Sequence, residues 1–173
     1  MDHADDPELR EALDKQVLHD LTMLYCRAVD RHDVALLSQV FHDDAEIQHG
    51  DFCGTADAFA RQLPALFGGA ECTYHCVGNS LFRIDGDRAW GELYALIYFN
   101  RGEDGALLDS LLGARFVDQY ARRDGQWKIT RRQLVMDWNQ NQPCSAEWEA
   151  GMYGQLRARG CRGPDDPVYG MST

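Results

Sequence analysis

The chain has 173 residues, which fits one domain that is large enough to bury a core and enclose a pocket. Its apolar fraction of 45% and aromatic fraction of 10% are typical of a globular protein and exclude a disordered or fibrous one. The formal net charge of -11 disfavours attraction to phosphate backbones or anionic lipid, so we expect neither nucleic acid nor a membrane as a partner.

Six cysteines are spread through the sequence, but a disulfide framework requires a secretory context that the sequence does not indicate. The first residues, 1–6, are acidic and lack the apolar centre of a signal peptide. No run approaches the roughly 18 apolar residues of a membrane span. We therefore expect reduced thiols and a cytoplasmic protein.

Three helices are predicted in the first part of the chain. The first begins at Pro7 and ends near residues 30–32, because apolar side chains recur every three or four residues along one stripe, at Leu13, Val17, Leu21, Leu24 and Ala28. Asp33 is placed to cap a second helix that includes Phe41. Thr55 caps a third, which Pro64 kinks or ends and the pair Gly68-Gly69 closes.

The remaining elements are strands. Residues 43–54 predict a small hairpin, and residues 71–138 predict four consecutive strands joined by turns at Asp85-Gly86, residues 102–105 and Asp124-Gly125. Short turns cannot connect parallel strands, so the fold class is α+β, with a curved antiparallel sheet covered on one face by the helices. We predict a single domain over residues 1–173. In it, residues 139–143 form a linker and residues 145–159 a short helix.

Several sequence motifs resemble the SnoaL-like branch of the NTF2-like α+β cone fold. The resemblance covers about residues 10–140 and rests on Leu18-His19-Asp20-Leu21, Tyr25 with Asp30 five residues later, Phe41-His42-Asp43-Asp44-Ala45, Tyr120-x-Arg-Arg-Asp-Gly-x-Trp-Lys-Ile and Arg131-Arg132. Within this branch the chain is most similar to bile acid 7α-dehydratase, hexachlorocyclohexane dehydrochlorinase and scytalone dehydratase. The resemblance implies a cone with an enclosed hydrophobic pocket.

The resemblance also implies a site. Asp30, at the end of the first helix, and His75, in the apolar strand 73–79, match the base dyad of the first two of these enzyme families. An imidazole held by a carboxylate has a fixed tautomer and suits a general base near neutral pH. Arg132 matches an arginine of the last strand, where it would stabilise negative charge or simply bridge to Asp30 or another buried carboxylate. Tyr25 matches the dehydratase tyrosine, and the acid that assists the leaving group has no clear match.

Candidate substrate-binding residues come from strand alternation. Trp90, Tyr94 and Tyr98 share one strand face, and Met136 and Trp138 share a face with Arg132. Such aromatic residues would favour a bulky hydrophobic, cyclic or aromatic substrate, although a stripe of this kind is more often plain core. A last candidate is Asn79, which could hydrogen-bond in the pocket or serve as an ordinary turn residue.

We expect no metal and no cofactor. Cys72, His75, Cys76 and His49 contain zinc-binding residue types, but they lack the paired second half of a structural zinc site. The sequence contains no phosphate-binding glycine loop and no dinucleotide fingerprint. It also has no recognisable signature of a nucleophilic cysteine.

Together these features predict a cofactor-independent lyase, either a dehydratase or other eliminating enzyme, or one that cleaves a carbon–carbon bond by a retro-aldol step. The alternative is a non-catalytic protein of the same fold, either a ligand-binding module or the small subunit of a ring-hydroxylating dioxygenase. A ketosteroid-isomerase-like site would need an acidic base and an oxyanion hole that we cannot place. The family resemblance further implies a homo-oligomer, expected to be a trimer, with residues 139–173 closing the pocket or forming an interface.

Overall fold

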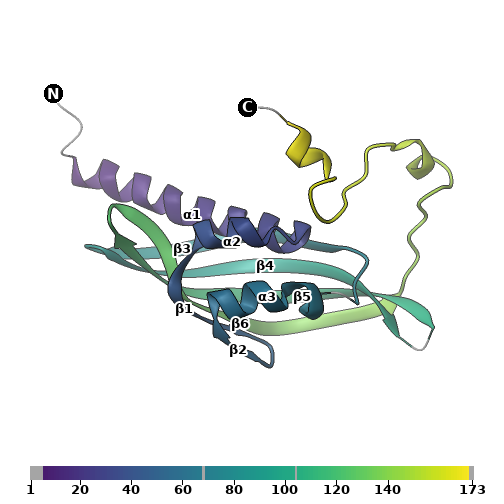
Figure 1. Cartoon of the computed structure of the whole chain (residues 1–173), viewed down its shortest axis with the longest axis horizontal. Coiled ribbons are helices and arrows are strands. Elements are labelled where there is room, and N and C mark those ends of the chain that lie inside the picture. The colour runs from purple at the N-terminus through teal and green to yellow at the C-terminus, as the bar shows by residue number, and fades with distance from the viewer. Residues whose placement is uncertain (1–5, 68, 104, 172–173) are drawn as a thin grey trace.

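The computed structural model of the chain describes residues 6–67, 69–103 and 105–171 (Figure 1). Residues 1–5 and the predicted turn residues Gly68 and Asp104 lie outside these ranges. In chain order the elements are α1 (Pro7–Arg31), α2 (Val34–Val40), β1 (Phe41–His49), β2 (Phe52–Thr55), α3 (Ala56–Leu66), β3 (Thr73–Asp85), β4 (Arg88–Glu103), β5 (Ala106–Arg123), β6 (Gln126–Pro143) and the 3₁₀ turns η2 (Tyr153–Gln155) and η3 (Pro167–Gly170).

The ends of the helices follow from capping residues. Asp6 accepts a hydrogen bond from the backbone N–H of Glu8 at the start of α1, and His32 ends that helix in the left-handed conformation, with φ of 54°. Asp33 and Thr55 cap α2 and α3 as predicted, each through a side-chain oxygen. These caps fix the short connection between α1 and α2, and with it the position of the last turn of α1.

The buried stripe of α1 differs from the prediction. Leu18, Leu21, Tyr25 and Val29 are in the core, whereas Leu13 and Val17 are exposed. In the first turns of the helix, the polar residue Asp14 contacts the sheet instead.

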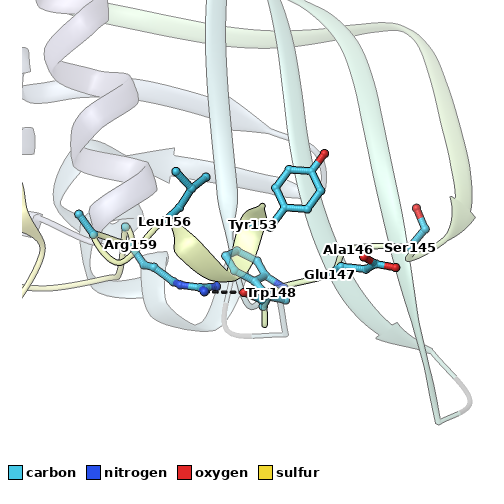
Figure 2. Close-up of a pocket in the computed structure, with 9 residues that line it drawn as sticks. Ser145, Ala146, Glu147, Trp148, Tyr153, Leu156 and Arg159 are labelled. Carbon is cyan, nitrogen blue, oxygen red and sulfur yellow. Dashed lines mark hydrogen bonds between the residues drawn. The ribbon is translucent and has the colours of Figure 1, made fainter. Parts of the chain in front are cut away.

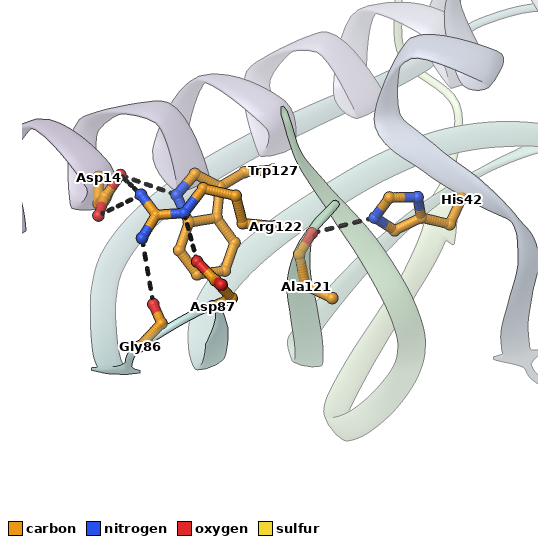
Figure 3. A network of polar contacts seen from close by, with 7 residues as sticks. All are labelled: Asp14, His42, Gly86, Asp87, Ala121, Arg122 and Trp127. Carbon is orange, nitrogen blue, oxygen red and sulfur yellow. Dashed lines mark hydrogen bonds and ion pairs between the residues drawn. The ribbon is translucent and has the colours of Figure 1, made fainter. Parts of the chain in front are cut away.

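Asp14 accepts hydrogen bonds from the Arg122 guanidinium at 3.0 Å and from the Trp127 indole at 2.8 Å (Figure 3). Arg122 also binds Asp87 in the turn between β3 and β4. Because charge-assisted hydrogen bonds replace apolar packing here, the apolar stripe of α1 begins only at Leu18.

One further boundary corrects the sequence prediction. Phe41 is the first residue of β1 rather than part of the second helix, and it is buried under α1 against the Tyr25 ring. Pro64 lies inside α3, which ends two residues later at Leu66. Because proline has no N–H, it removes one hydrogen bond from the last turn, and the helix ends within two residues of it.

The six strands form one curved sheet in the order β2-β1-β6-β5-β4-β3, with the helices on one face (Figure 1). The α+β class and the predicted meander of four long antiparallel strands are confirmed. The prediction of a wholly antiparallel sheet is wrong in one place, because β1 pairs with β6 in parallel. The chain can make this pairing because α3 and the other three strands of the meander separate β1 from β6.

Bulges decide which side chains face the helices. The register of β3 against β4 shifts between Val77 and Ser80, and that of β6 against β5 shifts twice. Each extra residue reverses the alternation of the side chains beyond it. The inner face therefore carries His75 before the bulge in β3 but Phe82 after it, where Phe82 packs against Gly91.

The C-terminal part of the chain differs most from the prediction. The predicted linker 139–143 is the end of β6, paired with β5 as far as Pro143. Residues 145–159 contain only the turn η2 instead of a helix. Gly151 has φ of 56° and Gly154 lies against the backbone of Glu149, so glycine geometry interrupts helical hydrogen bonding in this segment. None of the described helices combines the length and the apolar composition needed to cross a membrane.

Candidate active site

His75 and Asp30 meet beneath the last turn of α1. The Asp30 Oδ1 atom lies 2.7 Å from His75 Nδ1, and Asp30 Oδ2 accepts the backbone N–H of His75 at 3.0 Å. Both side chains are almost completely buried. Because a carboxylate only accepts hydrogen bonds, this contact places the ring proton on Nδ1 and leaves Nε2 with its lone pair.

The unused ring nitrogen is the chemically notable atom of this pair. His75 Nε2 is buried and has no hydrogen-bond partner among the described residues. Buried polar atoms are nearly always paired, so an unpaired one beside a cavity indicates a place for a ligand or water. The Asp30 carboxylate would stabilise an imidazolium if Nε2 took up a proton.

His75 lines a cavity of about 480 Å³ between the inner sheet face and the C-terminal end of α3. This volume is within the usual range for a small-molecule site. The walls are mainly apolar, with His49, His75 and Arg101 as the polar or charged side chains among them. The lining residues are His49, Gly50, Leu66, Phe67, Gly69, Ala70, His75, Ile97, Phe99, Arg101, Leu112, Leu134 and Met136.

His49 is the second imidazole of this cavity, and the sequence analysis considered it only as a zinc ligand. It follows Ala45 and Ile47 on one face of β1, and its ring packs between Phe59 and Phe67 at centroid distances of 5.8 and 5.7 Å. Burial, together with the neighbouring positive charges, lowers the pKa of His49 from 6.5 to about 4. It is therefore neutral at pH 7 and can donate one hydrogen bond and accept another.

Tyr25 lies behind the dyad, packed in the core. Its ring is edge-on to that of His75 at 6.3 Å, and the Arg132 guanidinium carbon lies 4.1 Å from its centroid. The hydroxyl is buried and has no hydrogen-bond partner among the described residues. Burial raises the pKa of Tyr25, so the phenol keeps its proton and remains a potential donor.

Arg132 is held by a partner that the sequence analysis did not name. Its Nε and Nη2 atoms donate to the two carboxylate oxygens of Asp118 at 2.9 and 2.6 Å, and Tyr120 donates to the same carboxylate. Although burial alone would lower the pKa of Arg132, the Asp118 charge outweighs it, and the net pKa is raised. Arg132 does not line the cavity, so the geometry favours the structural alternative of a bridge to a buried carboxylate.

Of the six candidate substrate-binding residues, Met136 alone lines the His75 cavity. Trp90 lies on the opposite sheet face, over β5 and β6 beside Arg115, and Tyr94 is half exposed on that same outer face. Their placement in the cavity is therefore wrong. The residues of β4 that do line it, Ile97 and Phe99, have the other parity along the strand.

The other three candidates are also outside the cavity. Tyr98 donates a hydrogen bond to Asp109 at 2.7 Å on the outer face. The bulge after Met136 turns Trp138 to the outer face, where its ring covers Gly113 so closely that a Cβ there would lie 2.2 Å from it. Asn79 falls at the bulge of β3 and is exposed.

The cysteines and histidines considered as metal ligands do not converge. Cys76 is exposed on the outer face, one residue from the inward-facing His75. Within the described part of the chain, no three His, Cys, Asp or Glu side chains are arranged to hold a metal ion.

A second cavity, of about 460 Å³, lies in the C-terminal segment (Figure 2). All of its lining residues belong to residues 145–160, including Trp148, Tyr153 and Leu156, and Arg159 donates to the Trp148 carbonyl. This hollow has an apolar wall but contains no dyad residue. We therefore place the candidate active site at the His75 cavity.

The chain was compared with known proteins. A family model described as the SnoaL-like domain matches residues 10–133. Comparison with curated proteins gives no significant match.

Among solved structures, LinA is 24% identical, with a TM-score of 0.70 over 81% of this chain and 95% of that chain. Hexachlorocyclohexane dehydrochlorinase LinA-type3 from Novosphingobium barchaimii is 22% identical, with a TM-score of 0.70 over 81% and 96%. A protein provisionally described as a scytalone dehydratase, from Novosphingobium aromaticivorans, is 20% identical, with a TM-score of 0.67 over 79% and 92%. At these identities the similarity establishes the fold. Because the family model covers most of the chain, the protein belongs to the SnoaL-like domain family.

Proposed function

We propose that this protein is a cofactor-independent lyase in which His75 removes a proton from a bulky hydrophobic, cyclic or aromatic substrate. The observation that carries the proposal is the 2.7 Å contact of His75 Nδ1 with Asp30, together with an Nε2 atom that has no partner among the described residues and belongs to a side chain lining the cavity. The dehydrochlorinases among the structural neighbours support an eliminating reaction on this fold.

The reaction follows from the geometry of the dyad. Nε2 takes a proton from the carbon adjacent to the one that bears the leaving group, the electron pair of that C–H bond forms the new double bond, and the leaving group departs with the electrons of its bond to carbon. The imidazolium formed is stabilised by Asp30. A base acting instead on a hydroxyl proton would drive retro-aldol cleavage of a carbon–carbon bond. Both reactions use the same proton-accepting atom.

His49 is the best placed group to assist departure of the leaving group. It lines the same cavity as His75 and is neutral at pH 7, so its N–H can donate to a departing oxygen or halide. The Tyr25 phenol also keeps its proton next to the His75 ring, but Tyr25 does not line the cavity, so His49 is the better placed donor.

The apolar lining favours the proposed substrate class. Leu112, Leu134, Met136, Ile97 and Phe99 form a wall with few hydrogen-bonding groups. Such a wall binds a ring compound by burying its surface and leaves orientation to the few polar atoms.

The test is a screen of hydroxylated and halogenated cyclic compounds, followed by variants of the active protein. His75→Ala should lower turnover by about 10²–10⁴-fold, because that is the usual contribution of a general base. His42→Gln is a matched control, since His42 also uses a ring nitrogen, bound to the Ala121 carbonyl at the other end of the sheet (Figure 3). Near-normal turnover of a folded His75→Ala variant would reject the proposed base.

We also propose that the protein is a homo-oligomer, most simply a trimer, that associates through the outer sheet face. That face exposes large apolar side chains with no helix over them, including Tyr74, Leu81, Trp90, Tyr94, Leu96 and Trp138. Exposed apolar area of this kind marks an interaction surface. Light scattering that gives the mass of a monomer would contradict this.

A further inference from the structure

The C-terminal segment is fastened to the end of α1, next to the dyad, although it lies outside the residues that match the family. The backbone N–H of Gly163 donates to the Arg31 carbonyl at 2.8 Å, and the Tyr169 hydroxyl donates to Asp33 at 2.8 Å. Arg31 lies 3.3 Å from the buried carboxylate of Asp166. The last turn of α1, which positions Asp30, is therefore also where this segment docks.

Asp166 shapes the loop that precedes it. Its two oxygens accept the backbone N–H groups of Cys161 and Val168, at 2.9 and 3.0 Å. These bonds close a turn around residues 161–168. Arg162 lies within this turn, next to Gly163, whose N–H binds the Arg31 carbonyl at the end of α1.

Two guanidinium nitrogen atoms of Arg162 have no hydrogen-bond partner among the described residues. These atoms are Nε and Nη2, and both are buried. His32, next to Arg31 at the docking point, likewise has a buried Nε2 atom without a partner. Three unsatisfied nitrogen atoms thus lie where the segment meets the end of α1.

The neighbouring acid is already committed. Asp30 acts electrostatically on both Arg162 and His32, but its two oxygens are bound to the ring and backbone of His75. Burial lowers the pKa of Arg162, and Asp30, already bound to His75, offsets this only in part. Two of the three guanidinium nitrogen atoms are therefore shielded from water without a hydrogen bond in return, and a bound anion would supply the missing acceptors.

The site adjoins the cavity. The His32 ring contacts Phe67 at 6.5 Å, and Phe67 and Ala70 line the cavity that contains His75. Cys72, two residues after Ala70, also interacts electrostatically with Arg162.

We propose that Arg162 and His32 form a binding site for a carboxylate, so that the cyclic substrate of the proposed lyase is an acid. The planar fork of a guanidinium matches the two oxygens of a carboxylate. The claim that this acid is the substrate of a lyase rests on the proposed function, whereas the claim that the site binds a carboxylate does not. In this chain the C-terminal segment supplies a specificity residue that the matched domain, residues 10–133, does not contain.

The test measures binding of benzoate and of neutral benzyl alcohol to the full chain by calorimetry. Wild-type protein should bind benzoate at least about tenfold more tightly than benzyl alcohol, because a hydrogen bond to a charged group contributes that much or more. Arg162→Gln should lose this preference, and Arg162→Lys should keep part of it because it keeps the charge without the fork. Arg157→Gln, with the same charge change on an exposed residue of the same segment, should bind both compounds as the wild type does.

Two results would overturn the proposal: wild-type protein that does not prefer benzoate, or a folded Arg162→Gln variant that retains the preference. Inorganic phosphate that displaces benzoate with equal affinity would overturn the assignment to a carboxylate. His75→Gln separates the two proposals, because it should abolish turnover and leave benzoate binding intact. Loss of the carboxylate preference in His75→Gln would count against a separate site at Arg162.

Discussion

Asp30 and Asp118 are both buried carboxylates that hold a nitrogen-bearing side chain against the ring of Phe116, yet the two pairs end differently. Asp118 holds Arg132 through two hydrogen bonds. The Nη1 atom of Arg132 has no hydrogen-bond partner among the described residues, and the guanidinium lies over two aromatic faces. Asp30 holds His75, whose remaining nitrogen belongs to a side chain that lines a cavity. A buried, hydrogen-bonded pair is therefore a candidate for catalysis only where its unpaired atom belongs to a side chain that borders a cavity.

The largest expected difference between the two pairs is in stability. Asp118→Asn should lower the free energy of unfolding by about 3–5 kcal/mol, because it leaves the Arg132 guanidinium buried without its counter-charge. His75→Gln should cost less, about 1.5–3 kcal/mol, since it removes one hydrogen bond to the Asp30 carboxylate, which still accepts the backbone N–H of residue 75. Urea unfolding of both variants measures the difference. Equal losses would mean that the two pairs have the same structural role.

A smaller effect is expected in the pH dependence of stability, through His49 in the cavity wall. His49 has a pKa of about 4 in the folded protein against 6.5 as its ordinary value. Between these values the unfolded chain binds a proton that the folded chain does not, so stability falls as pH drops from 6.5 toward 4. The slope from this residue is up to about 1.4 kcal/mol per pH unit.

Urea unfolding at pH 7 and pH 5, for wild type and His49→Gln, isolates this contribution because other titrating groups are common to both proteins. The wild type should lose more stability than the variant between the two pH values. Parallel losses would show that His49 is not held neutral in the cavity wall.

The smallest effect is expected at an exposed ion pair. Asp44 accepts from Arg123 at 2.8 Å on the surface, where solvent screens the charges. Asp44→Asn should leave the urea midpoint unchanged within error. A clear shift would mean that exposed pairs also stabilise this fold, which would weaken the contrast with the buried pair of Asp118.

The features that the sequence predicts correctly depend on interactions between residues that are close together in the chain. Capping residues such as Asp33 and Thr55, and the pair Asp124-Gly125 with positive φ at both residues, determine their structure through near neighbours. The family motifs added Asp30 and His75, which are 45 residues apart and which no spacing rule could have brought together.

Bulges in the strands account for several errors in predicting which residues lie opposite each other or share a sheet face. Counting back from the Asp124-Gly125 turn, Arg123 pairs with Gln126 and Tyr120 with Ile129, which would set Asp118 opposite Arg131. One extra residue in β6 sets it opposite Arg132 instead.

A bulge also lies between Met136 and Trp138. The two side chains therefore lie on opposite sheet faces, whereas strict alternation predicted the same face. By contrast, His49 could have been found, because Ala45, Ile47 and His49 alternate along one strand face in the sequence.

The central claim is that Asp30 fixes the tautomer of His75 so that Nε2 is the free base. Long-range ¹H–¹⁵N correlation spectra of the histidine rings measure this directly. In wild-type protein at neutral pH, the account predicts that His75 carries its proton on Nδ1 and has an unprotonated Nε2, and that Asp30→Asn disturbs this state while the ring of His42 keeps its signals. A His75 ring protonated on Nε2 in the wild type, with Nδ1 bare, would contradict it.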